Sequence, residues 1–295
     1  MQEAGERSEY LELLKRVLAA TLYDESAWTI EGTGAGRYPK RRPWVAAAEA
    51  VRAVRRWTAT AGRRVRTRVV RCDPYDAQAA EEGRRWPMFG YTMIGVKRLD
   101  HLERCMADVV ERNVPGDFLE AGVWRGGATI FMRAFLKAHG IGERRVWVAD
   151  SFEGLPPARG RDREMGDADL SGEAHLKVSL EQVRANFARF GLLDERVRFV
   201  KGWFHESLPA APVERLAVLR LDGDMYSSTM DTLQALYDKV SPGGWVIVDD
   251  YPGWEGCRRA TDEFRASRGI TAPLEKIDWT GVCWRVAGDE GGGRR

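Results

Sequence analysis

The sequence is poor in the residues that build thiolate metal centres, disulfide frameworks and histidine clusters. Its 295 residues contain four cysteines and four histidines, and no two cysteines have C-x-x-C spacing. No pair of histidines has the spacing of metal ligands either. The pattern argues against a zinc site or a disulfide-stabilised fold, and these cysteines suit a reducing cytoplasm, where we expect the protein to be located.

Long hydrophobic runs are also absent. No apolar stretch approaches the ~18 residues that a membrane span needs, and the N-terminus, MQEAGERSEY, has no apolar signal region. We therefore expect no contact with a membrane. A content of 44% hydrophobic and 31% charged residues is typical of a soluble globular protein. The length allows one large domain, or one domain with an appendage.

Charge is distributed unevenly along the chain. The stretch from Arg37 to Arg71 holds twelve Lys/Arg and one acid, a charge of +11, so the net charge of +2 leaves −9 for the remainder. Such a block could bind nucleic acid or an acidic partner. It lacks the interleaved aromatic residues of a single-strand binder, having only Tyr38, Trp44 and Trp57. We favour a solvated or poorly ordered surface segment over nucleic-acid binding.

The N-terminal part shows weak periodicity. Residues 10–22 have apolar side chains at helical spacing and predict an amphipathic helix. Residues 31–42 are rich in glycine and basic residues and predict a loop, whereas residues 44–57 could form a second helix. We divide the chain into three parts. Residues 1–85 form an N-terminal helical region with the basic segment, residues 86–287 form a second domain, and residues 288–295 form a tail that is disordered by composition.

Strands and helices alternate in the second domain. Strand-like runs occupy residues 118–122, 146–150, 197–200, 216–221, 245–248, 274–277 and 282–286. Helices are predicted at residues 99–113, 128–139, 179–190, 228–240 and 254–268, with a turn at 241–244 and a long loop at 154–174. The alternation predicts a doubly wound, mostly parallel α/β sheet. The last two runs, joined by a short turn, predict an antiparallel edge pair.

Carboxylates follow two of these strands directly. Asp222 follows the run at 216–221, and Asp249 and Asp250 follow the run at 245–248. The carboxyl ends of parallel strands face the same side of a sheet, so the three side chains can converge. Two adjacent acids after a buried strand repel each other unless a cation or hydrogen-bond donors compensate, and Mg²⁺ prefers such oxygen ligands. Asp224 fits a helix cap or a turn as well as it fits a metal site.

A glycine-rich turn follows the first strand. In residues 120–127 (EAGVWRGG), Glu120 precedes Gly122, and the spacing is not G-x-G-x-x-G. An acid at this turn would repel the pyrophosphate of NAD and attract a cationic ligand such as S-adenosylmethionine. Asp150 ends the second strand, where an acid accepts hydrogen bonds from ribose hydroxyls. Phe152 could cover the adenine, and Gly202 with Trp203 could line its other side.

Several blocks together resemble one known family. They are YTMIGVKRLD, FLEAGVWRGGATIFM, VADSFEGLP, VSLEQVRANF, VKGWF, LRLDGDMYSST and SPGGWVIVDDY. They are similar to the macrocin O-methyltransferase family of tylosin-, mycinamicin- and novobiocin-type sugar O-methyltransferases. The resemblance runs from about Tyr91 to Val286. It implies a seven-stranded Rossmann-like methyltransferase sheet, with a lid formed by Tyr91 to Ile94 and the N-terminal helix.

The resemblance also implies roles for individual residues. Asp222, Asp249 and Asp250 would hold the metal, and Asp222 would act as the catalytic base. The methyl donor would contact Thr92, Met93, Glu120, Ala121, Gly122, Val123, Trp124, Asp150, Ser151, Phe152, Glu153, Gly154, Ser179, Gly202, Trp203 and Asp222.

The family implies an enzyme that uses S-adenosylmethionine and Mg²⁺. It would methylate a deoxysugar hydroxyl of a glycosylated bacterial natural product such as an antibiotic. A catechol or flavonoid O-methyltransferase uses a similar fold and metal and is the alternative enzyme. A nucleic-acid-binding protein that acts through the basic segment is the alternative from another class. We expect a homo-oligomer, a dimer, as the working state.

Overall fold

The computed structural model describes residues 2–22, 27–29, 71–73, 76–85, 87 and 89–287. The predicted loop at 31–42, the possible helix at 44–57, nearly all of the basic segment and the tail at 288–295 lie outside these residues. Two short strands, β1 (Ala27–Thr29) and β2 (Arg71–Asp73), pair antiparallel, with Thr29 opposite Arg71.

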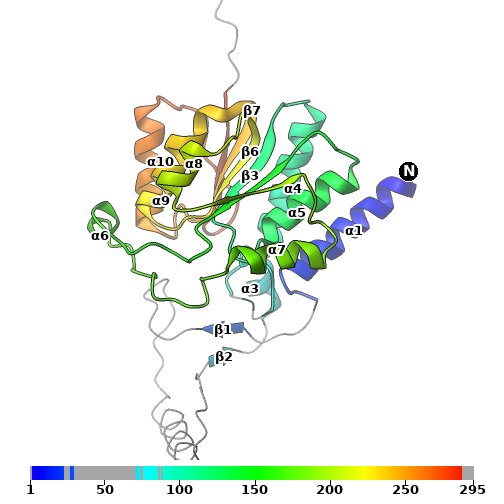
Figure 1. Cartoon of the computed structure of the whole chain (residues 1–295), viewed down its shortest axis with the longest axis horizontal. Helices are drawn as coiled ribbons and strands as arrows, with labels where there is room; N and C mark the ends of the chain where they lie inside the picture. The colour runs from blue at the N-terminus through cyan, green and yellow to red at the C-terminus, as the bar shows by residue number, and fades with distance from the viewer. Residues whose placement is uncertain are drawn as a thin grey trace, which may run out of the picture.

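A seven-stranded sheet with the order β5-β4-β3-β6-β7-β9-β8 forms the centre of the molecule (Figure 1). The first five strands of this order run parallel, and β9 is antiparallel to both of its neighbours, β7 and β8. The predicted fold and its antiparallel edge pair are therefore confirmed. The strands are β3 (Asp117–Ala121), β4 (Val146–Asp150), β5 (Val197–Lys201), β6 (Leu216–Leu221), β7 (Val240–Val248), β8 (Glu275–Lys276) and β9 (Val282–Arg285).

The sheet is buried on both faces because its central strands are almost wholly apolar. In β3, Phe118 belongs to the core on one face and Leu119 to the core on the other. One face carries α4 (Gly95–Glu111), α5 (Gly127–Ala138) and α7 (Leu180–Arg189), and the other carries α8 (Phe204–Ala210), α9 (Tyr226–Leu236) and α10 (Glu255–Ser267) (Figure 1). Strand order reverses between β3 and β6, which places a crevice at the carboxyl ends of the strands.

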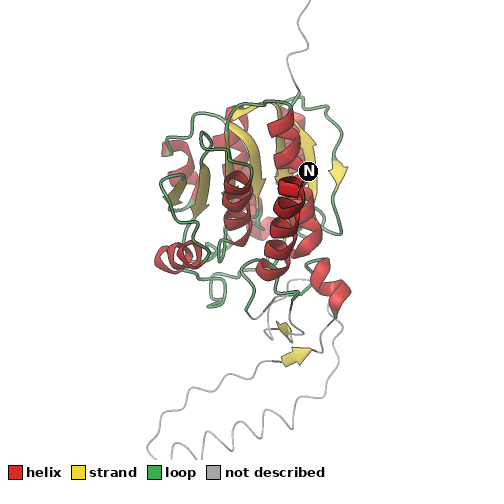
Figure 2. Ribbon diagram, turned by 90° about the vertical axis from the view of Figure 1, so that its right-hand side faces the viewer, coloured by secondary structure: helices red, strands yellow, loops and turns green. Residues whose placement is uncertain are grey.

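The N-terminal helix α1 (Gln2–Leu18) begins and ends earlier than the predicted helix at 10–22. It lies outside α4 and α5, farther from the sheet (Figures 1 and 2). Three leucines at helical spacing bury its inner face against these helices: Leu11, Leu14 and Leu18. Helix α1 therefore belongs to the packed core of the domain.

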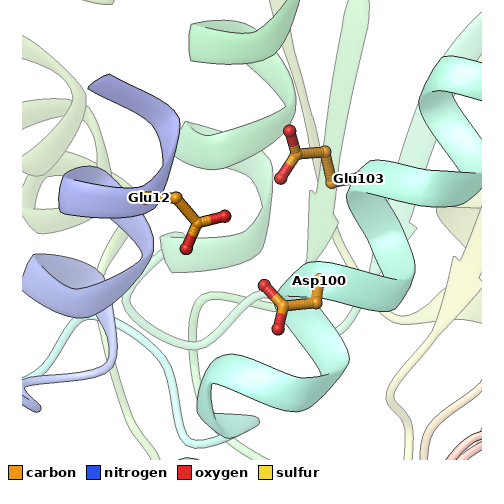
Figure 3. A group of neighbouring side chains, drawn as sticks. All are labelled: Glu12, Asp100 and Glu103. Carbon is orange, nitrogen blue, oxygen red and sulfur yellow. The ribbon is translucent and has the colours of Figure 1, made fainter. Parts of the chain in front are cut away.

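A buried lysine also fastens α1. Figure 3 shows Glu12, Asp100 and Glu103 facing one another between α1 and α4, in an arrangement that could hold a cation. The ammonium of Lys15 already lies among them: it binds Glu12 and Asp100, and it lies 2.9 Å from Glu103. The group is thus an internal ion cluster that joins the two helices.

The predicted turn at residues 241–244 is wrong, because these residues lie within β7. Leu216 pairs with Val240 and Val218 pairs with Trp245, so the segment bulges opposite β6. Gly243 N–H donates to Val286 O at 2.9 Å, and Val286 N–H donates to Gly244 O at 2.8 Å. Pairing with the end of β9 therefore draws a turn-prone sequence into the sheet. The preceding helix, α9, ends at Leu236 and a 3₁₀ turn, η1 (Tyr237–Lys239), follows it.

Short helices complete the described parts of the chain. One is α3 (Ala77–Glu81), which packs on α4. The other is α6 (Arg161–Glu164), which lies within the predicted loop at 154–174. Within the residues that the structure describes, no helix has the length and hydrophobicity that crossing a membrane would require.

Candidate active site

A cavity of about 1010 Å³ opens at the carboxyl ends of β3, β4, β6 and β7. It brings together side chains that lie far apart in the sequence. The three predicted metal ligands, Asp222, Asp249 and Asp250, all line it. Of the residues predicted to contact the donor, those that line it are Thr92, Met93, Glu120, Gly122, Val123, Trp124, Asp150, Ser151, Gly154, Gly202, Trp203 and Asp222.

Four of the predicted donor contacts are placed elsewhere. Ala121 is buried within β3, and Phe152 packs in the core, its ring centroid 6.4 Å from that of Phe199. Glu153 is exposed. Ser179 caps α7, where its Oγ accepts from Gln182 N–H at 3.2 Å. The side chain of Gln182 donates to Asn186 rather than back to Ser179, so the reciprocal bond of a capping box is not formed. A side chain that covers adenine should line the cavity, and Phe152 does not line it.

The turn after β3 is held tightly against its neighbours. Gly122 has φ +89°, and a Cβ there would lie 1.8 Å from the carbonyl oxygen of Asp222, so only glycine fits. Asp150 organises the same region. One of its oxygens accepts from Val123 N–H at 2.8 Å, and the other accepts from Phe152 N–H at 2.8 Å. Asp150 thus fixes the loops after both β3 and β4, and burial raises its pKa.

Glu120 is a buried acid, and one of its carboxyl oxygens has no hydrogen-bond partner. Its Oε1 accepts from Arg220, whereas its Oε2 is buried and has no partner. Burial raises the pKa of Glu120 to about 8, although Arg220 opposes this shift. An acceptor oxygen that is buried in a cavity wall without a donor favours a ligand that supplies one.

Arg220 is the central cation of the site, and it was not among the predicted site residues. It lies in β6 and is fully buried. Its Nη1 donates to Glu120 and, at 2.9 Å, to Asp222, and its Nη2 donates to Asp249. The sequence holds one signal for it: a charged residue within an apolar run of a buried strand must be paired.

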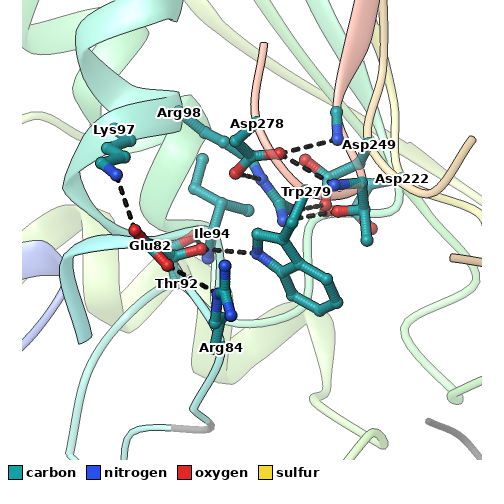
Figure 4. Close-up of polar contacts among 12 residues, drawn as sticks. Glu82, Arg84, Thr92, Ile94, Lys97, Arg98, Asp222, Asp249, Asp278 and Trp279 are labelled. Carbon is teal, nitrogen blue, oxygen red and sulfur yellow. Dashed lines mark hydrogen bonds and ion pairs between the residues drawn. The ribbon is translucent and has the colours of Figure 1, made fainter. Parts of the chain in front are cut away.

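Asp249 differs from a carboxylate that is available to a metal ion, because its oxygens are already occupied. Its Oδ2 accepts from Arg98 (Figure 4). Its Oδ1 accepts from Arg220, so both oxygens already bind cations. Arg98, from α4, also donates through Nε to Asp278 Oδ2 at 2.7 Å and through Nη2 to Thr280 Oγ1 at 2.5 Å. Arg98 therefore ties α4 to the end of β7 and to the turn before β9.

Asp224 takes the third place in a cluster with Asp222 and Asp250. One carboxylate oxygen from each of these three residues lies within 4.8 Å of the others. Helix α9 has Met225 at its N-cap and no side-chain cap, so the alternative reading of Asp224 as a cap does not hold. Asp222 and Asp224 are two positions apart, a spacing that puts side chains on one side of an extended chain. That spacing could have indicated Asp224.

The three carboxylates lie close enough to repel one another. Burial raises the pKa of Asp222 to about 6, with a further rise from Asp249 and opposition from Arg220. Burial, followed by the charge on Asp222, raises the pKa of Asp224 to about 8. The pKa of Asp250 is raised by burial and then by Asp224, and its Oδ2 is buried without a partner. The donor set is all oxygen, and Arg220, at 2.9 Å from Asp222, supplies a single cation for three carboxylates. Such a set fits a hard divalent cation.

Residues 91–94 form the part of the predicted lid that reaches the cavity. Thr92, Met93 and Ile94 line it, whereas no residue of α1 does. Helix α1 supports this segment from behind: Tyr91 N–H donates to Leu18 O at 2.8 Å. On its other side, Gly127 N–H donates to Tyr91 O at 2.9 Å.

The loop at residues 154–174 is pinned to two helix N-termini. Asp162 accepts from Ser227 N–H, in α9, at 2.8 Å. Asp167 accepts from Tyr226 N–H at 3.0 Å and from Gly256 N–H, in α10, at 3.1 Å. Both aspartates are buried. This part of the cavity rim is therefore fixed by backbone hydrogen bonds.

Comparison with known proteins gives a consistent result. The family model for macrocin-O-methyltransferase (TylF) matches residues 7–286. An 8-demethyl-8-(2,3-dimethoxy-alpha-L-rhamnosyl)-tetracenomycin-C 4'-O-methyltransferase of Streptomyces olivaceus is 54% identical over 213 residues, which cover 71% of this chain and 81% of that protein. A demethyldecarbamoylnovobiocin O-methyltransferase of Streptomyces niveus is 52% identical over 214 residues, covering 72% and 81%.

A solved structure agrees with the sequence relatives. The O-methyltransferase NovP superposes with a TM-score of 0.77 at 42% identity, covering 96% of this chain and 100% of that one. The extent of the family match and these identities show that the chain belongs to the macrocin-O-methyltransferase family and is an O-methyltransferase.

Proposed function

We propose that this O-methyltransferase uses S-adenosylmethionine and a divalent cation, Mg²⁺, to methylate a sugar hydroxyl of a glycosylated natural product. Two related enzymes that support the acceptor class are named for a rhamnosyl-tetracenomycin and for mycinamicin III. One observation carries the proposal: Glu120, which has an unpartnered oxygen, and the Asp222–Asp224–Asp250 cluster line the same cavity.

The donor half of the cavity suits a cationic ligand with a ribose. Glu120 has an unpartnered carboxyl oxygen beside the Gly122 turn, where the donor's ammonium would favour the charged form of the acid. Asp150 lies at the end of β4 and lines the cavity, where an acid is placed to accept from a ribose hydroxyl. Trp203 lines the wall on the side of β5. When bound, S-adenosylmethionine supplies the electrophilic methyl group.

The acceptor half is the acidic cluster. We propose Asp222, Asp224 and Asp250 as the cation ligands, with Asp249 orienting the site through its two arginines. This replaces Asp249 in the expected set with Asp224. A bound divalent cation lowers the pKa of a sugar hydroxyl and orients it.

Asp222 stands at the boundary between the two halves and is proposed as the base. It accepts from Arg220 at 2.9 Å and also belongs to the acidic cluster. A carboxylate in this position can accept the proton that the sugar hydroxyl loses. Arg220 fixes the orientation of this carboxylate and of Glu120, so the chain itself aligns base and donor site.

Methyl transfer to defined acceptors tests the proposal. The purified protein is incubated with S-adenosylmethionine and, separately, demethyldecarbamoylnovobiocin, mycinamicin III or a catechol, and the products are followed by mass. We expect at least one glycoside to gain one methyl group, and this gain to disappear in EDTA and return with Mg²⁺. Methylation of the catechol alone would favour the alternative enzyme class. Full activity in EDTA would remove the cation from the mechanism.

Three expectations from the sequence stay predictions. The homodimer can be checked by light scattering after gel filtration, and the cytoplasmic location by fractionation of the source cell. Nearly all of the basic segment at 37–71 lies outside the described residues. A binding assay with duplex DNA across a salt series tests it, since phosphate contacts give a steep salt dependence.

A further inference from the structure

Trp279 is a large aromatic residue on the rim of the cavity that remains 42% exposed. It lies in the turn between β8 and β9. An exposed indole keeps apolar surface in contact with water, so burying it against a ligand is favourable. The position is therefore suited to recognition.

The indole is held in place from three directions. Figure 4 shows Arg98 bound to Asp278, the residue before Trp279. Arg98 also donates at 2.5 Å to Thr280, the residue after Trp279. The indole Nε1–H of Trp279 donates to the carbonyl oxygen of Glu82 at 2.7 Å. A side chain fixed in this way loses little further conformational freedom when a ligand packs on it.

The same arginine connects Trp279 with the reacting end of the cavity. Arg98 binds Asp249, which directly precedes Asp250 of the acidic cluster. A Cβ placed on Gly253 would lie 2.8 Å from Thr280 Cγ2, so the turns after β7 and before β9 touch. The neighbouring Trp254 lines the cavity as well. Two indoles thus border the part of the cavity next to the cluster.

The chemistry around Trp279 suits a ring with one apolar face and a polar edge. Guanidinium carbons of Arg84 and Arg98 lie 5.8 Å and 5.5 Å from the indole ring centre, which increases its rigidity. The exposed part of the indole is apolar, whereas the nearby cluster of Asp222, Asp224 and Asp250 is anionic. A sugar ring presents C–H groups on its face and hydroxyls at its edge.

We propose that Trp279 determines acceptor specificity by packing against the C–H face of the acceptor sugar, with the sugar's hydroxyl edge toward the acidic cluster. This inference rests on the proposed sugar O-methyltransferase function. Removing the indole should weaken capture of the acceptor, whereas binding of the methyl donor, at the ends of β3 and β4, should be unaffected.

The test compares Trp279→Ala, Trp279→Phe and Tyr10→Ala with the wild type, using the glycoside that the wild type methylates. Tyr10 is a matched control, since it is 44% exposed but lies on α1 and does not line the cavity. For Trp279→Ala we expect the acceptor KM to rise about tenfold, the scale of one lost ring contact. The Kd of S-adenosylmethionine by calorimetry should stay within about twofold of the wild type. Trp279→Phe should recover most of the loss.

Each outcome decides between the two proposals. An unchanged acceptor KM in Trp279→Ala, with an active wild type, overturns the inference and leaves the function intact. Parallel losses in acceptor KM, donor affinity and melting temperature assign Trp279 a structural role and also overturn it. A wild type that methylates none of the glycosides overturns the proposed function, and the inference falls with it.

Discussion

Arg98, from α4, and Arg220, from β6, bind opposite oxygens of one carboxylate, that of Asp249. Both arginines and the aspartate are almost completely buried. Arg220 also binds Glu120 and Asp222, so one side chain connects the donor side of the cavity with the acidic side. The stability and the chemistry of the site therefore share a charge network.

Removing the cation of Arg220 should leave Glu120 and Asp222 without their bound cation, and Asp249 with Arg98 alone. We expect Arg220→Met to lower the free energy of unfolding by about 3–5 kcal/mol, as measured by urea denaturation. The control Arg258→Ala removes a surface cation that pairs with Glu255 at 2.6 Å and should cost at most about 1 kcal/mol. Equal stability of Arg220→Met and wild type would mean that the carboxylates become neutral without cost.

Glu120 should lose a proton when the donor binds. With a pKa of about 8 it is mostly protonated at pH 7, and a nearby ammonium favours its charged form. Calorimetry at pH 7 in buffers of different ionisation enthalpy should show proton release on binding S-adenosylmethionine. Glu120→Gln should abolish the release and weaken affinity about tenfold or more. The exposed Glu195→Gln serves as the control, and proton release that persists in Glu120→Gln would exclude Glu120 as its source.

Asp224 and Asp249 should respond differently to loss of charge. We expect Asp224→Asn to lower kcat about 100-fold and to raise the Mg²⁺ concentration needed for half-maximal rate, because a ligand is lost. Asp249→Asn should mainly lower stability, since Arg98 and Arg220 lose their shared partner. Magnesium titrations of activity, paired with melting curves, separate the two effects. The reverse pattern would restore Asp249 as the ligand.

Acid should destabilise the protein through His101. Its ring nitrogens lie 3.7 Å from the sulfur of Cys105 and 3.3 Å from that of Cys283. Burial, followed by Arg104, lowers the pKa of His101 to about 4 against the opposing charge of Asp278. Between this pKa and the ordinary value of 6.5, the unfolded chain binds a proton at His101 that the folded chain does not bind. The contribution of His101 to the free energy of unfolding is therefore fully present above pH 6.5 and is lost as the pH falls toward 4.

The histidine's share can be isolated with one variant. Urea unfolding of the wild type between pH 7.5 and 4.5 should show a loss of which His101 contributes on the order of 2–3 kcal/mol. The loss should be smaller by that amount in His101→Gln. An identical pH dependence in both proteins would assign the loss to other groups.

The ends of the segment at residues 30–70 lie side by side, because Thr29 pairs with Arg71. An Asn-Gly turn can close such an antiparallel pair. Replacing residues 30–70 with Asn-Gly should therefore leave folding and the donor Kd unchanged. It should also leave turnover within about threefold of wild type, since Glu120 and the acidic cluster come from β3 and from the turns after β6 and β7. A folded variant without turnover would place the segment at the acceptor or at a required subunit contact.

The positions of the strands along the chain and the acids at their ends follow from local features of the sequence. Apolar runs that end at Asp150, Asp222 and Asp249 predict strands whose carboxyl ends share one edge of a sheet. The glycine-rich turn after Glu120 indicates the donor site for the same reason. Periodicity and turn chemistry act over a few residues, so they can be read without a structure.

Contacts between distant segments were decided only by the tertiary structure. Arg98 and Arg220 reach Asp249 from separate elements, and their pairing removes this carboxylate from the acidic cluster, where Asp224 takes its place. Pairing with the end of β9 also overrides the turn preference of residues 241–244. In both cases a partner far away in the sequence forms a hydrogen bond with a buried polar group. The free energy gained from that bond exceeds the preference of the local sequence for another conformation or contact.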